Sequence, residues 1–83
     1  MNPDFCVEGI VIKKQHGKDG YEATIRTSDK KEYIAVASYA NSGEQYKMVF
    51  IGDSVKICCG SDDTFTIRGT LHLLARYITV KKT

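Results

Sequence analysis

Apolar and polar residues alternate along most of the chain, which is the pattern of strands that bury one face. The runs that carry this alternation are 5–14, 21–26, 32–37, 55–60 and 64–73. Turn-forming residues separate them, including Asp19-Gly20, which is a strong hairpin signal. The pattern therefore predicts five strands and no long helix.

The first run, 5–14, becomes apolar on both faces toward its end, which suits a strand that serves two sheets. Gly9 in its middle is the expected place for a bulge or sharp coil, which lets a strand turn the corner of a barrel. A simpler sandwich strand remains the alternative.

The third run, 32–37, has aliphatic and smaller residues on opposite faces. Either face is tolerable inside a barrel. We place the bulkier Ile34 and Val36 inside, which turns the other row outward: Tyr33, Ala35, Ala37 and Tyr39. A polar, turn-like connector follows over residues 38–47.

Gly52-Asp53 bends the chain into the fourth strand, 55–60. We expect a positive φ at the glycine and an Asp carboxylate that bonds the backbone two residues on. From Thr64 onward, apolar residues keep period two as far as Leu73. This predicts one long last strand with a bulge, although a short helix over 71–78 also fits the spacing.

Four short motifs resemble the oligonucleotide/oligosaccharide-binding (OB) barrels of bacterial translation initiation factor 1 and S1 domains. They are Glu8-Gly9-Ile10-Val11, Tyr21-Glu22-Ala23-Thr24-Ile25, Gly52-Asp53-Ser54-Val55 and Thr66-Ile67-Arg68-Gly69. The resemblance implies an all-β, five-stranded OB-like barrel over residues 1–83, with an irregular connector between strands three and four and an extended C-terminal strand. It also implies a single-stranded nucleic-acid ligand, with RNA favoured over DNA. Glu44 stands where the factor has a basic stretch, so a ribosomal role does not follow.

Length and composition restrict the remaining possibilities. The 83 residues are 42% hydrophobic, which suits one small folded domain. No apolar run reaches the roughly 18 residues of a membrane span, and no signal peptide is visible. Cys6, Cys58 and Cys59 are an odd number without metal-ligand spacing, so we expect buried, reduced cysteines, no metal and a cytoplasmic location.

The net charge of +2 neither requires nor excludes a polyanionic ligand. On the expected outer face, Tyr33 and Tyr39 would stack on bases. Cations beside them would hold phosphates: Arg26, Lys18, Lys30 and Lys31. Exposed tyrosines are also common in strands for β-propensity alone, and Asp62-Asp63 would repel phosphate.

No spacing of His, Ser or Cys suggests a catalytic triad, and there is no phosphate-binding loop, so we expect neither an enzyme nor a cofactor. The alternative function is a protein-interaction barrel without a nucleic-acid ligand. Its partner, or a second copy, would dock on the apolar tail formed by Leu73, Leu74, Tyr77 and Ile78.

Overall fold

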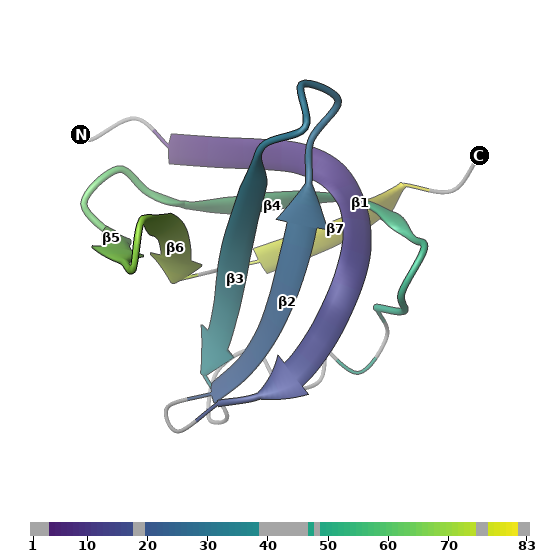
Figure 1. The fold of residues 1–83 in the computed structure, drawn as a ribbon, viewed down its shortest axis with the longest axis horizontal. Coiled ribbons are helices and arrows are strands. Elements are labelled where there is room, and N and C mark those ends of the chain that lie inside the picture. Colours follow the sequence, from purple (N-terminus) through teal and green to yellow (C-terminus); the bar gives the residue numbers. More distant parts are fainter. Residues whose placement is uncertain (1–3, 18–19, 39–46, 48, 75–76, 82–83) are drawn as a thin grey trace.

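The computed structural model of the chain describes residues 4–17, 20–38, 47, 49–74 and 77–81. The described strands form one sheet in the order β5-β6-β3-β2-β1-β4-β7 (Figure 1). Their bounds are β1 (Asp4–His16), β2 (Gly20–Arg26), β3 (Glu32–Ser38), β4 (Ser54–Gly60), β5 (Thr64–Ile67), β6 (Thr70–Leu74) and β7 (Tyr77–Lys81). The predicted all-β class is confirmed, and the last predicted strand is divided into three.

The long β1 strand curves through the sheet and has two antiparallel neighbours (Figure 1). It pairs with β4 over residues 4–10 and with β2 over residues 10–16. Both neighbours belong to the same sheet, so the prediction that this strand serves two sheets is wrong for the described strands. The prediction of a bulge at Gly9 is wrong, because the register shifts between Val11 and Lys13. Gly9 instead permits a close approach, since a Cβ there would lie 2.4 Å from the carbonyl oxygen of Arg26.

The Gly52-Asp53 turn fastens the loop before β4 to β1. Gly52 has a φ of 98°, as predicted, and its N–H donates to the Val11 carbonyl at 2.8 Å. The Asp53 carboxylate accepts from the N–H of Phe50 at 2.9 Å, not from a residue further on as predicted. The Asp53 N–H already donates to the Phe50 carbonyl, which brings these two residues face to face across the turn.

A tight turn separates β5 from β6, so the expected single strand from Thr64 is wrong. Arg68 and Gly69 have φ values of 52° and 82°, and two successive positive values are the signature of a type I′ hairpin turn. Directly opposed residues share a face, and Ile67 lies opposite Thr70. Odd-numbered residues of β5 therefore share a face with even-numbered residues of β6. Apolar residues before the turn therefore point away from the core side to which Leu73 belongs.

The described residues of the C-terminal third form strands, as predicted, and the alternative prediction of a short helix over 71–78 is wrong. β6 pairs in parallel with β3, and β7 pairs antiparallel with β4. Residues 75–76, which follow the register slip expected at Leu73-Leu74, lie outside the described residues, as do 39–46 in the expected connector.

The core contains the residue row of β3 that we expected outside. Ala35 is 1% exposed, Ala37 is fully buried and Tyr33 packs partly against the same cluster. Ile34 lies on the opposite, outer face and is partly exposed, so its placement in the interior is wrong, whereas Val36 shares that outer face but is buried, with an exposed fraction of 8%. The neighbouring strands decide the face, because Ala35 lies opposite both Ala23 and Leu73, which are core residues themselves.

The expectation of three reduced cysteines is also wrong. Cys6 of β1 lies directly opposite Cys58 of β4, and the two form a disulfide with a Cα–Cα distance of 4.1 Å. The pair is 52 residues apart in the chain, so only the strand register reveals it. Cys59 points to the other face and is buried in the core without a disulfide. Among the described residues, no helix is long and apolar enough to cross a membrane.

Candidate functional site

Large apolar side chains occupy the outer face of β3, β6 and β5. The strand registers place Ile34, His72 and Phe65 in one row across the three strands. Val36 lies opposite Leu74 in the next row. We call the following group the outer apolar face: Ile34, Val36, Phe65, Ile67 and Leu74.

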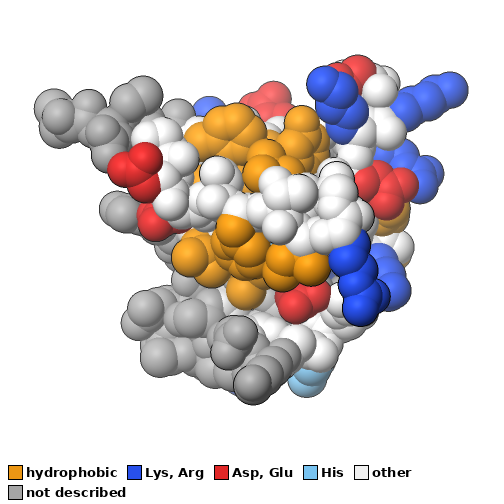
Figure 2. Space-filling view, turned by 60° about the vertical axis from the view of Figure 1, so that its left-hand side comes forward, with side chains coloured by type: hydrophobic (Ala, Val, Ile, Leu, Met, Phe, Trp, Pro, Cys, Tyr) orange, Lys and Arg blue, Asp and Glu red, His pale blue; other side chains and the backbone are white. Residues whose placement is uncertain are grey.

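Three members of the outer apolar face are open to solvent. The exposed fraction is 37% for Phe65, 49% for Ile67 and 45% for Leu74. Figure 2, in which the side of the molecule carrying β5 and β6 comes forward, shows apolar side chains gathered in two bands with charged side chains at the margins. An apolar centre with a charged rim is the usual composition of a protein–protein interface.

His72 holds the Phe65 ring in place on this face. The His72 side chain is only 7% exposed, and its ring stacks on that of Phe65 with 5.1 Å between centroids. Its Nδ1 lies 2.9 Å from the Thr70 carbonyl oxygen, which can only accept, so Nδ1 carries the proton. The stack therefore restricts the Phe65 ring, and a side chain that is already ordered loses less entropy in any contact.

A second exposed apolar group surrounds the Gly52 turn. Ile10, Phe50 and Ile51 are 43%, 61% and 63% exposed. Lys14 interrupts this group: its Nζ lies 5.6 Å from the centre of the Phe50 ring and donates to the Val49 carbonyl at 2.5 Å. The group lies on a turn beside a cation, so it offers a partner a less continuous apolar surface than the outer apolar face.

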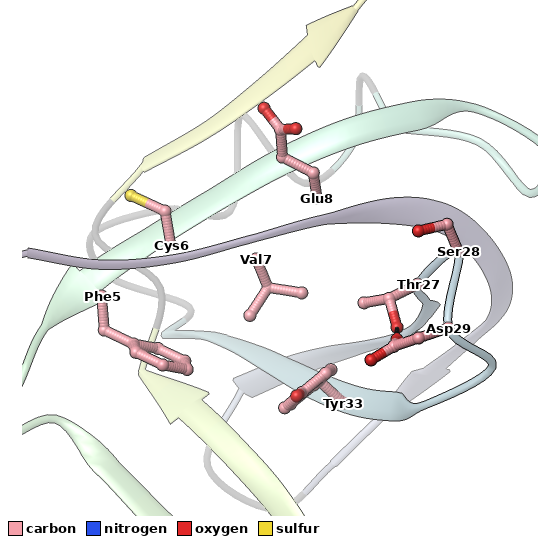
Figure 3. Close-up of a pocket in the computed structure, with 8 residues that line it drawn as sticks. All are labelled: Phe5, Cys6, Val7, Glu8, Thr27, Ser28, Asp29 and Tyr33. Atoms are coloured by element: carbon pink, nitrogen blue, oxygen red, sulfur yellow. Dashed lines mark hydrogen bonds between the residues drawn. The ribbon is translucent and has the colours of Figure 1, made fainter.

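An open cleft of about 410 Å³ lies between the first half of β1 and the turn that joins β2 to β3 (Figure 3). The side chains of Phe5, Val7 and Tyr33 point into it, whereas Cys6 and Glu8 point away from it. Its rim consists of Thr27, Ser28 and Asp29. The cleft therefore has an apolar floor and a polar edge.

The edge of the cleft is anionic. The Thr27 hydroxyl donates to the Asp29 carboxylate and holds the pKa of Asp29 below its ordinary value of 3.8. Slight desolvation opposes this effect, while a backbone hydrogen bond from Lys31 and the positive charge of Lys31, 3.9 Å away, add to it. A fixed negative charge at this edge repels phosphate.

The structure separates the residues predicted to bind nucleic acid. Tyr33 is half-buried on the core side of the sheet, while Arg26 is exposed and forms an ion pair with Glu32 at 2.8 Å. Lys30, whose φ is 67°, and Lys31 are exposed on the turn after β2. Tyr39 and Lys18 lie outside the described residues. Arg26, Lys30 and Lys31 are thus grouped near one turn, and Tyr33 is not on their face.

The predicted docking tail is divided as well. Leu73 is 1% exposed and belongs to the core, so its predicted role in docking is wrong, whereas Leu74 is 45% exposed. The side chains of Tyr77 and Ile78 are outside the described ones. Sequence reasoning missed Phe65 and Ile67, because it placed them with Leu73 in one period-two row of a single strand. The dipeptide Arg68-Gly69 was the available signal, because a glycine after a polar residue favours a two-residue hairpin turn.

The chain matches no protein-family model and no curated protein sequence. Among the described residues, no group of three or more His, Cys, Asp or Glu side chains is placed to hold a metal ion.

Proposed function

We propose that the chain is a protein-interaction β-domain that docks another polypeptide on the outer apolar face. The observation that carries this proposal is the reversal of faces at the Arg68-Gly69 turn, which exposes Phe65 and Ile67 beside Leu74. Contiguous apolar surface in contact with water is costly, at about 25 cal/mol per Å², and commonly marks an interaction site. The preset stack of Phe65 on His72 supports a rigid anchor at its centre.

Single-stranded nucleic-acid binding, with RNA favoured over DNA, is the second candidate. The exposed Lys30 and Lys31 near Arg26 support it, because cations grouped at one turn attract phosphates. Its support is weaker, because Glu32 and Asp29 neutralise part of that charge. The half-buried position of Tyr33 also leaves this group without a described aromatic platform on the same face.

The finer fold assignment is part of the proposal. We propose that β6 and β7 are two halves of one strand that closes the sheet into an OB-like barrel. Only residues 75–76 separate them, and β6 pairs with β3 at one end of the sheet order while β7 pairs with β4 at the other. β5 is then an addition to the loop that enters the closing strand. A barrel closed in this way leaves no open edge on β1 to β4, and the β5 edge stays open.

Photo-crosslinking in cells tests the docking face. The photoreactive amino acid p-benzoyl-phenylalanine replaces Leu74 on the outer apolar face or, as a matched control, Lys56 on β4, which is also exposed. We expect polypeptide adducts from position 74 and few from position 56. Adducts that nuclease removes would favour the second candidate. Equal adduct yields from the two positions would overturn the docking proposal.

A cytoplasmic location remains a proposal, and the Cys6–Cys58 disulfide weighs against it, because cytosolic thiols are kept reduced. Lysis in denaturant that contains an excess of alkylating agent, followed by mass measurement, tests the location. A chain from a reducing compartment carries three alkyl groups. One with the disulfide intact carries a single group, on Cys59.

A further inference from the structure

We propose that the polypeptide docked beside this face is a second copy of the chain, which pairs edge to edge through β5 and contacts the face at Phe65. This inference rests on the proposed function and names its partner. β5 is the last strand of the sheet at its end, and among the described residues it pairs only with β6 (Figure 1). An unpaired strand edge presents a row of backbone donors and acceptors to another chain.

The hairpin geometry identifies which backbone groups face the open edge. In a two-residue hairpin the flanking residues, here Ile67 and Thr70, exchange both hydrogen bonds, and such pairs then alternate along the strands. The bond from the Leu74 N–H to the Asp63 carbonyl, 2.9 Å, fits this alternation. The N–H and C=O groups of Thr64 and Thr66 therefore point outward, away from β6.

The sequence of the edge strand lacks two features by which natural edge strands avoid self-pairing, which are charged residues and proline. Residues 64–67 read Thr-Phe-Thr-Ile and include no charged residue and no proline. All four residues are β-branched or aromatic, which are the types that favour strands. The strand is short, so pairing adds few hydrogen bonds and a reversible dimer is expected.

One antiparallel register pairs all four outward backbone groups of each copy, which are the N–H and C=O groups of Thr64 and Thr66. Thr64 lies opposite Thr66 of the second copy, and Thr66 lies opposite its Thr64, which gives four hydrogen bonds across the edge. Phe65 then faces the second copy's Phe65 on the two-fold axis, in a pair without hydrogen bonds, where side chains approach most closely. The two outer apolar faces become continuous across this axis.

The charges at the ends of β5 are complementary in the same register. Asp62 precedes the strand and Arg68 follows it, and both are exposed. Antiparallel self-pairing places Asp62 opposite Arg68 of the second copy, and symmetry repeats this pair at the other end. A parallel arrangement would instead place like charges together, so the charges favour the antiparallel dimer.

Analytical ultracentrifugation over a range of concentrations tests the dimer. We expect a reversible monomer–dimer equilibrium for the unmodified chain. Thr66→Pro removes a donor that points outward and leaves the β5–β6 bonds in place, so it should remain folded by circular dichroism and monomeric throughout. Thr66→Val keeps the N–H and is the matched control, which should still dimerise. An unmodified chain that stays monomeric, or a Thr66→Pro variant that dimerises equally, overturns the inference.

Disulfide trapping tests the register with two variants of one strand. Oxidised glutathione oxidises two engineered thiols to an intermolecular disulfide and is itself reduced to two glutathione thiols. Phe65→Cys should crosslink readily, because directly opposed Cα atoms of this pair type lie about 4.5 Å apart. Ile67→Cys should not, because the two copies of position 67 are displaced by roughly 13 Å along the strands. Equal crosslinking of the two variants overturns the proposed pairing.

The photo-crosslinking experiment distinguishes failure of the self-pairing inference from failure of the proposed protein-interaction function. Adducts from position 74 that contain a different polypeptide, with a monomeric chain in the centrifuge, overturn self-pairing and leave the protein-interaction function standing. A monomeric chain whose adduct yields from positions 74 and 56 are equal overturns both.

Discussion

On β3 the small residues face the core and the large aliphatic residues face outward, which is the reverse of what their sizes predict. The core side has Ala35 and Ala37, which are nearly or fully buried, while the larger Ile34 and Val36 lie on the outer side, where Val36 is nevertheless buried with an exposed fraction of 8%. The difference shows that bulk alone does not identify the buried face of a strand.

The same contrast recurs between neighbouring residues of β6. Leu73 and Leu74 are identical in chemistry, yet their exposed fractions are 1% and 45%. Leu73 packs with the core cluster, and Leu74 lies on the outer apolar face beside Val36. This pair therefore measures the free energy of the inner face against that of the outer face with a single type of substitution.

Leu73→Ala should give the largest effect, a loss of about 2–5 kcal/mol of unfolding free energy, because it leaves a cavity in the core. Leu74→Ala is the matched control and should cost about 1 kcal/mol or less in the monomer, since its site is already partly hydrated. Urea unfolding measured at low protein concentration compares the two. Equal losses would mean that the two faces of β6 are not inner and outer.

The disulfide on the outer side should contribute the next largest effect. Closing a loop across 52 residues restricts the unfolded chain, so reduction of Cys6–Cys58 should lower the unfolding free energy by about 2–4 kcal/mol. Urea unfolding with and without dithiothreitol measures this loss. The double variant Cys6→Ala, Cys58→Ala should be insensitive to the reductant, and a response from it would assign the effect elsewhere.

The smallest effect belongs to the turn at the cleft, which lies on neither face of β6. Thr27→Val removes the hydroxyl that donates to Asp29, so the pKa of Asp29 should rise toward its ordinary 3.8. A lowered folded pKa stabilises the protein above the unfolded value, and this stabilisation disappears as the pH falls through the folded pKa. Thr27→Val should thus weaken the acid sensitivity of stability. NMR titration of the Asp29 carboxyl measures the shift, and an unchanged pKa would contradict this cause.

Local sequence signals were sufficient to identify most strands. Alternation gave β2, β3 and β4 nearly to their ends, and Gly52 has the positive φ that its turn was expected to need. These features depend on residues close together in the chain, such as a glycine that tolerates the left-handed region. The all-β class followed from them.

The candidate site was not predictable from the same signals. Alternation has period two, and a two-residue turn preserves that spacing in the sequence while it exchanges the faces. Phe65, Ile67 and Leu73 therefore have the sequence spacing of a single strand face. In the structure Phe65 and Ile67 lie on the outer face and Leu73 lies on the core face.

The sequence by itself determined where most of the strands are and that they form an all-β domain, because backbone preferences and alternation are local. Tertiary structure decided which face of each strand is buried, that Cys6 lies opposite Cys58, and that Phe65 and Ile67 are exposed beside an open edge. Each of these depends on strand register, which pairs residues far apart in the chain and is fixed by the packing of the whole core.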